Sequence, residues 1–161
     1  YNNYYGDYIR RVPEEDIIDA MGKQLVETLA IFRRIPEEKT SERIDGKWSV
    51  REVLGHLIDA ERNFSYRAYR FAHKDTAPLP GFEQDDYVRE GNANQRTTDD
   101  LLDEFALLRR STIAAFRNIT PEIGQRTGIA SGNPISVRAL LYLTVGYERR
   151  HVEILRKRFG V

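Results

Sequence analysis

The sequence contains no cysteine, which excludes disulfide bonds, thiolate metal sites and a cysteine nucleophile. Histidine is nearly as scarce, because the 161 residues include only His56, His73 and His151. Any metal site must therefore combine these imidazoles with carboxylate or phenolate groups.

An excess of charge of either sign is also lacking, since 25 Lys and Arg residues balance 25 Asp and Glu residues. Non-specific binding of nucleic acid needs surplus positive charge to neutralise phosphates. The balance therefore argues against a nucleic-acid partner.

Long hydrophobic runs are absent as well. The longest nearly apolar run, residues 139–146, is interrupted by Thr144, whereas a membrane-spanning helix needs about 20 residues. No charged segment followed by an apolar one opens the sequence, so no signal peptide is expected. We therefore expect a cytoplasmic protein that makes no use of a membrane.

The composition is that of a folded protein, with 40% hydrophobic and 31% charged residues. The length indicates one domain that spans residues 1–161. Four stretches carry apolar residues at the 3.6-residue period of an amphipathic helix. They cover about residues 13–35, 49–71, 97–119 and 136–160.

Local signals support these boundaries. Pro13 suits the first turn of a helix, and Ser49 with Glu52 forms a capping box. Thr97 or Thr98 is a suitable start for the third helix, and Ser136 for the fourth. The segment that precedes Pro13 is rich in Tyr and Asn and is expected to pack as an irregular arm.

Alternation with a period of two is missing over any useful length, so a sheet is not expected. The pattern predicts an all-α fold, a four-helix bundle with two long connecting loops at residues 73–97 and 120–135. Long loops in a compact domain are usually functional or mobile. We expect the first of them to lie over one end of the bundle.

Two histidines and a tyrosine occupy positions where chemistry is plausible. At 100° per residue, Tyr147 and His151 lie within about 20° of the apolar face of the last helix. Glu148 lies on the shoulder of that face, and His56 lies on the border of the apolar stripe of the second helix. Asp59 or Glu52 could accept the second ring proton of His56, an arrangement that fixes the tautomer of a ligating imidazole.

Spacing alone leaves two interpretations of these residues open. An inward-facing histidine is more often a hydrogen-bonded core residue than a metal ligand. A buried tyrosine whose hydroxyl is satisfied is ordinary core material. His73, at the end of the second helix, is expected on the surface, and Glu61 is expected to pair with an arginine in solvent.

The stretch Trp48–Arg62 (WSVREVLGHLIDAER) resembles the second-helix signature of the DinB-like superfamily. Three further stretches also resemble segments of that family: residues 77–87, 133–141 and 146–155. The resemblance implies a four-helix bundle, often a homodimer, in which one histidine and a His-x-x-x-His pair hold a divalent metal such as Zn or Ni. Related bacterial proteins include thiol S-transferases that use bacillithiol or similar thiols and a mycothiol-dependent maleylpyruvate isomerase.

One position departs from the family pattern, because the middle histidine is Tyr147, four residues before His151. A phenol binds a metal well as phenolate, and with a pKa near 10 its deprotonation at pH 7 costs about 4 kcal/mol. Tyr147 can be a ligand, a hydrogen-bond partner to a metal-bound water, or a residue that has replaced the site. Glu148 could take the place of the missing ligand.

Two hypotheses follow from the resemblance. In the first, the protein is a metal-dependent enzyme, a thiol S-transferase or a hydrolase, with His56, Tyr147 and His151 as ligands of Zn or Ni. Its partner would be a small-molecule substrate or a low-molecular-weight thiol. In the second, the protein is a metal-free bundle that binds a small molecule or dimerises, and a hydrogen bond joins His56 to Tyr147. Both hypotheses place the three residues in one cluster near one end of the bundle.

Overall fold

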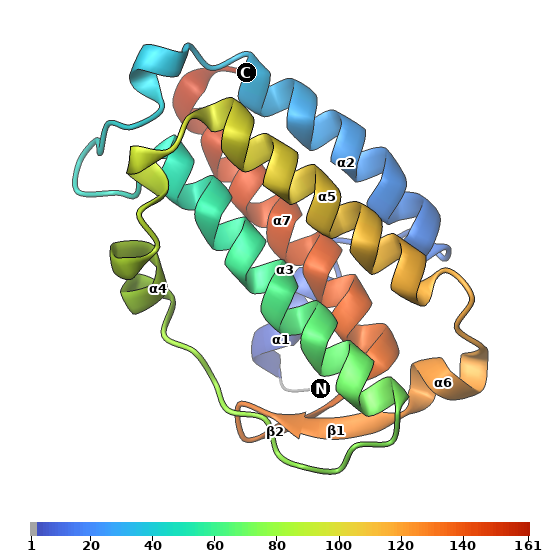
Figure 1. The fold of residues 1–161 in the computed structure, drawn as a ribbon. Helices are drawn as coiled ribbons and strands as arrows, with labels where there is room; N and C mark the ends of the chain where they lie inside the picture. Colours follow the sequence, from blue (N-terminus) through green and yellow to red (C-terminus); the bar gives the residue numbers. More distant parts are fainter. Residues whose placement is uncertain (1–2) are drawn as a thin grey trace.

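The computed structural model describes residues 3–161 and is mainly helical (Figure 1). Four long helices lie side by side, which confirms the predicted four-helix bundle. They are α2 (Ile17–Arg33), α3 (Val50–Ala72), α5 (Thr98–Phe116) and α7 (Val137–Phe159).

Shorter elements occupy the connections and the beginning of the chain. The short helices are α1 (Asn3–Ile9), α4 (Gln84–Glu90) and α6 (Pro121–Gln125), and single 3₁₀ turns span Glu37–Lys39 and Ala93–Gln95.

None of the helices described within residues 3–161 is long and apolar enough to cross a lipid bilayer.

Side chains cap the starts of the long helices by accepting hydrogen bonds from first-turn amides. Ser49 and Ser136 do so for α3 and α7, as predicted, and of the two candidates for α5 it is Thr97 that provides the cap. The start of α2 was predicted too early, because Asp16 provides its cap and Pro13 lies outside the helix. The Asp16 carboxylate accepts hydrogen bonds from two backbone amides. A proline side chain has no oxygen that could accept them.

The connection at residues 120–135 contains a small antiparallel hairpin, so the expectation that no sheet forms was wrong. Its strands are β1 (Thr127–Ala130) and β2 (Asn133–Ser136), and the first residue of one faces the last residue of the other. Ser131 and Gly132 form the turn with positive φ angles of 51° and 75°. Strands of four residues are too short for a periodic pattern to be recognised.

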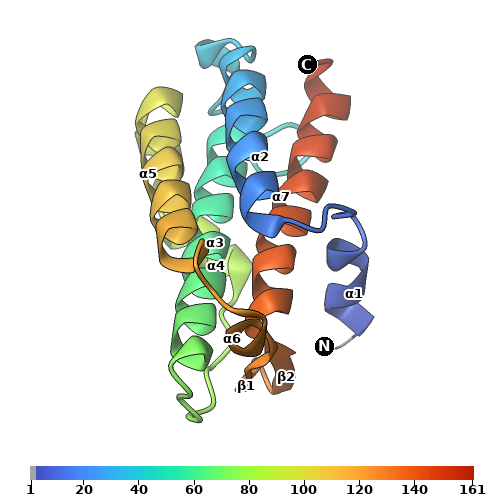
Figure 2. The same ribbon diagram turned by 90° about the vertical axis from the view of Figure 1, so that its right-hand side faces the viewer.

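The segment before Pro13 was predicted to be an irregular arm, but it forms α1, which lies along α7 (Figure 2). Gly146 of α7 allows this close approach, because a Cβ atom there would lie 1.9 Å from the carbonyl oxygen of Tyr8. The missing side chain therefore lets two backbones meet.

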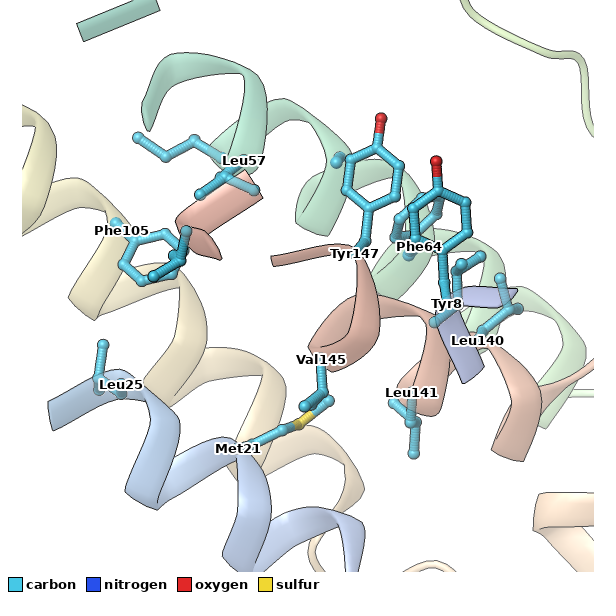
Figure 3. Packing of buried hydrophobic residues seen from close by; sticks show 14 of the residues in the cluster. Tyr8, Met21, Leu25, Leu57, Phe64, Phe105, Leu140, Leu141, Val145 and Tyr147 are labelled. Atoms are coloured by element: carbon cyan, nitrogen blue, oxygen red, sulfur yellow. The ribbon is translucent and has the colours of Figure 1, made fainter. Parts of the chain in front are cut away.

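The hydrophobic core is one continuous cluster between the helices, part of which is drawn in Figure 3. Helix α7 is central to it, since it packs against α1, α2 and α3. Core residues from these helices and from α5 include Met21, Leu25, Leu57, Phe105, Leu140 and Val145.

A charged group also lies inside this core. The Arg109 guanidinium is 1% exposed and forms ion pairs with Glu61 at 2.9 Å and with Glu148 at 2.6 Å. Thr28 donates a hydrogen bond to Glu148, and Arg109 donates one to the backbone oxygen of Met21. Glu61 was expected to pair with an arginine, and it does. The pair lies in the interior, however, and the expectation that it would lie in solvent was wrong. The network connects α2, α3, α5 and α7.

Candidate functional site

The structure brings His56, Tyr147 and His151 together, although His56 belongs to α3 and the other two to α7. The His56 Nε2 atom lies 2.7 Å from the Tyr147 hydroxyl oxygen, within hydrogen-bond distance. The His56 and His151 ring centroids are 5.1 Å apart, and those of Tyr147 and His151 are 4.8 Å apart. Because Tyr147 lies near the middle of α7, the cluster is on the side of the bundle. The expectation that it would lie near one end was therefore wrong.

Helix periodicity explains why the two α7 side chains meet. Residues four apart lie on one face of an α-helix, so Tyr147 and His151 both face α3. Glu148, the next residue, points the other way and is held in the core by Thr28 and Arg109. The idea that Glu148 could replace the missing ligand is therefore wrong.

His56 is fully buried, and its Nδ1 atom has no hydrogen-bond partner within the described part of the chain. Neither of the predicted acceptors, Glu52 and Asp59, accepts a hydrogen bond from the His56 ring. Glu52 instead pairs with Arg43 and accepts from the Ser49 amide, and Asp59 forms no hydrogen bond with the ring. The indole of Trp48 covers the ring at a centroid distance of 4.8 Å.

The hydrogen bonds of Tyr147 allow two proton arrangements. Its hydroxyl can donate to Gln84 Oε1 at 3.3 Å while it accepts from His56 Nε2–H. Alternatively, it can donate to His56 Nε2, and the proton of the imidazole is then on Nδ1. In both arrangements one buried nitrogen of His56 has no partner in the described protein.

Burial keeps both imidazoles neutral at pH 7. Removal from water lowers the pKa of His56 to about 4. It lowers the pKa of His151 to about 3, with smaller contributions from His56 and Arg150. Desolvation penalises the charged form of a base, so both rings are deprotonated at neutral pH.

A cavity of about 300 Å³ adjoins the Tyr147 side of the cluster. Figure 3 shows the rings of Tyr8, Phe64 and Tyr147 close together, and the centroids of Tyr8 and Phe64 are 5.0 and 5.6 Å from that of Tyr147. The cavity is lined by Tyr5, Phe64, Arg67, Phe82, Glu83, Gln84, Ser131 and Tyr147.

The connection at residues 73–97 flanks this site, through Gln84 of α4 and through Phe82 and Glu83 before it. Leu79, which comes earlier in the same connection, is hydrogen-bonded through its backbone to the hairpin. His73 is exposed and lies near the backbone oxygen of Tyr69, at the far end of α3 from His56. As expected, it is a surface residue.

Sequence reasoning missed Gln84 and Arg67 as parts of the site. Gln84 follows no periodic pattern, so only its place in a stretch that resembles the family pointed to it. Arg67 offered a clearer signal, because 11 residues after His56 is about three turns and returns to the same helix face.

The family model described as the DinB superfamily matches residues 21–155. This chain belongs to the DinB superfamily. Among solved structures, YfiT from Bacillus subtilis, described as a probable metal-dependent hydrolase with an unusual four-helix bundle topology, has a TM-score of 0.73 and 17% identity. The similarity covers 99% of this chain and 90% of YfiT.

The mycothiol-dependent maleylpyruvate isomerase is similar to this DinB protein with a TM-score of 0.72 and 11% identity. The similarity covers 95% of this chain and 63% of the isomerase. No curated protein matches the sequence of this DinB protein. At these identities, the two structures establish the shared fold.

The DinB resemblance implies a divalent metal, and the donor set of this chain can be compared with that requirement. Residues 3–161 contain no group of three His, Cys, Asp or Glu side chains that could hold a metal ion. A site therefore needs Tyr147 beside His56 and His151. The two neutral imidazoles, one with a buried nitrogen that lacks a partner, fit Zn or Ni.

Proposed function

We propose that this DinB protein is a metal-dependent enzyme that acts on a small molecule, with its reaction centre at His56, Tyr147 and His151. The observation that supports it best is the meeting of two neutral imidazoles and a phenol from antiparallel helices beside a cavity of about 300 Å³. His56 and His151 would hold Zn or Ni, and Tyr147 would be the third donor or lie next to it.

A bound metal would supply Lewis-acid chemistry and would make a thiol or a water nucleophilic at neutral pH. The side chains of this chain would position the reactants. Tyr147 and Gln84 present a hydroxyl and an amide at the cavity, where they can orient a polar group of the substrate. Tyr8, Phe64 and Trp48 pack around the cluster and keep bulk water out, which strengthens polar interactions inside.

The proposed reactions are thiol transfer to an electrophile and hydrolysis. Hydrolysis is supported by the likeness to YfiT, described as a probable metal-dependent hydrolase. Thiol chemistry is supported by the likeness to the mycothiol-dependent isomerase. Both reactions require a nucleophile activated at one centre, so the same residues serve either one.

Tyr147→His tests the metal site, because it supplies a third neutral nitrogen without the cost of deprotonating a phenol. We expect affinity for Zn or Ni to rise tenfold or more, since relief of about 1.4 kcal/mol already gives a factor of ten. His151→Ala should abolish binding. Competition with a chelator at fixed pH, on protein purified without a His tag, measures both variants.

His73→Ala is the matched control, because it removes an exposed histidine remote from the cluster and should leave the affinity unchanged. If the native protein binds as tightly as Tyr147→His, then Tyr147 is already an adequate ligand. If neither protein binds Zn or Ni, the metal-dependent proposal is rejected.

One observation favours a second candidate, a metal-free bundle that binds a small molecule. The 2.7 Å contact between His56 and Tyr147 pairs two of the three groups that would otherwise face a metal. In this case the native protein contains no Zn or Ni after purification without a His tag, and only Tyr147→His acquires it. Near-stoichiometric metal in the native protein rejects this candidate.

A further inference from the structure

Arg67 of α3 is a buried cation in the wall of the cavity. Its side chain lines the same space as Tyr147, and the residue is only 4% exposed. The Nη2 atom donates hydrogen bonds to the Pro80 backbone oxygen at 2.8 Å and to Ser131 Oγ at 3.1 Å. The Tyr5 hydroxyl also interacts with the guanidinium.

All of these oxygens are formally neutral. No carboxylate within residues 3–161 lies within 4.0 Å of the Arg67 nitrogens, in contrast to the two that pair with buried Arg109. Glu83 also lines the cavity, but it is exposed and accepts a hydrogen bond from the Asp85 amide at the start of α4. Burial lowers the pKa of Arg67 from its usual value, yet a guanidinium stays protonated in proteins.

A buried charge without a counter-ion is costly, so such groups are normally paired. The guanidinium has five N–H donors, and the Pro80, Ser131 and Tyr5 oxygens do not use all of them. The remaining donors can hydrogen-bond an anionic oxygen, and a hydrogen bond from a charged donor to a carboxylate is about twice as strong as one between neutral groups.

We propose that Arg67 is an anion subsite that binds the carboxylate of a small substrate while the other end of that substrate reaches Tyr147. This inference rests on the proposed function, because it assigns the substrate class for the same reaction centre. Arg67 lies one turn beyond Phe64, whose ring packs edge-on against that of Tyr147. A cavity of about 300 Å³ is at the small end of ligand sites, so the substrate is a small carboxylic acid.

The proposal is tested by direct binding of three probes, acetate, benzoate and phenylacetate, each compared with its neutral amide. Calorimetry gives the affinities, and NMR of the Arg67 side-chain N–H signals shows whether the guanidinium is touched. We expect at least one acid to bind tenfold or more tightly than its amide. That preference should disappear in Arg67→Met and persist in weakened form in Arg67→Lys.

Arg89→Met is the matched control, because Arg89 is an exposed cation on α4, which flanks the cavity. It should leave the preference for the acid unchanged. Arg67→Lys keeps the charge and therefore provides a readout even if Arg67→Met does not fold. No preference for any of the three acids in the native protein overturns the proposal, whatever the variants do.

Metal content separates this inference from the proposed function. Each protein is assayed for Zn and Ni before the binding experiment. Acid preference in a protein that binds no metal supports the anion subsite and rejects the metal-dependent function. Metal binding without acid preference is consistent with the metal-dependent function and rejects the anion subsite. A preference retained in Arg67→Met would show that another group binds the anion, and it overturns the assignment.

Discussion

Asp59 is a carboxyl group near the site whose pKa is raised by its surroundings. It lines a second cavity, of about 160 Å³, together with His56 and Glu104. Burial, and then the negative charge of Glu104, raise the pKa of Asp59 to about 6, while Arg62 opposes the shift. Because the folded protein holds this proton more tightly than the unfolded chain does, the group destabilises the fold once it ionises.

The sign of the pH effect follows from the usual and the raised pKa. Below pH 3.8 the carboxyl is protonated in both states, and between pH 3.8 and about 6 its stabilising contribution is lost as the pH rises. We expect Asp59→Asn to be more stable than the native protein at pH 7, by about 1 kcal/mol after allowance for partial solvent screening. Urea denaturation from pH 4 to pH 7 measures the difference.

Asp103→Asn provides the control, because Asp103 is exposed on α5 and forms no ion pair within residues 3–161. The advantage of Asp59→Asn should grow between pH 4 and 6 and then level off. A difference that is constant across this range would contradict the raised pKa.

Consecutive residues of α7 show how far sequence can predict a site. Tyr147 was placed correctly beside His151, because spacing along one helix fixes which side chains share a face. The direction of Glu148 was predicted wrongly, since it depends on Thr28 and Arg109, which lie 120 and 39 residues away. Contacts between helices depend on the rotation of each helix, which the periodic pattern specifies only coarsely.

At the scale of elements, the approach of α1 to α7 depends on Gly146. Gly146→Ala would place a Cβ atom 1.9 Å from the Tyr8 carbonyl oxygen, so α1 must move away. We expect a loss of about 1–3 kcal/mol in the free energy of unfolding, as for other overpacked contacts. Hydrogen exchange should show α1 opening first, because its docking is the contact that is lost.

Gly22→Ala in α2 is the matched control, because no atom lies within 4 Å of a Cβ atom added there. Alanine is favoured over glycine inside a helix, so this variant should gain about 0.5–1 kcal/mol. The two substitutions are chemically identical and should have opposite signs. Equal effects would show that the contact between α1 and α7 does not determine the stability.

The elements that the sequence did not reveal are short and depend on tertiary contacts. Helix α1 has seven residues, includes Gly6, and is held by its packing against Gly146. In the hairpin, Gly128 leaves space for Phe71, whose ring would lie 2.1 Å from an added Cβ atom. Pro134 within β2 also argued against a strand. The four long helices could be predicted because each carries its own cap and an apolar face.

At the scale of the whole molecule, the Arg109 network joins all four long helices through buried charges. Arg109→Met would leave the Glu61 and Glu148 carboxylates in the core without a cation. We expect it to lower the free energy of unfolding by about 3–5 kcal/mol, as for other broken buried pairs. Urea denaturation followed by circular dichroism measures the change.

Arg110→Met is the control, since Arg110 is exposed on the same helix and should change stability little. A second variant tests the reason for the loss. If Glu61 and Glu148 are also replaced by Leu, much of the stability should return, because no uncompensated charge remains. A single Arg109→Met variant as stable as the native protein would contradict this role of the network.

The position of α7 in the chain has a consequence for how the molecule is made. Tyr147 follows His56 by 91 residues, and α7 is the last of the four long helices to leave the ribosome. Until it emerges, the faces of α1, α2 and α3 that pack against it remain exposed. Since domains generally fold as units during synthesis, the nascent bundle must wait for α7 with its apolar surfaces open to chaperones, and the cluster of His56, Tyr147 and His151 can assemble only when α7 docks.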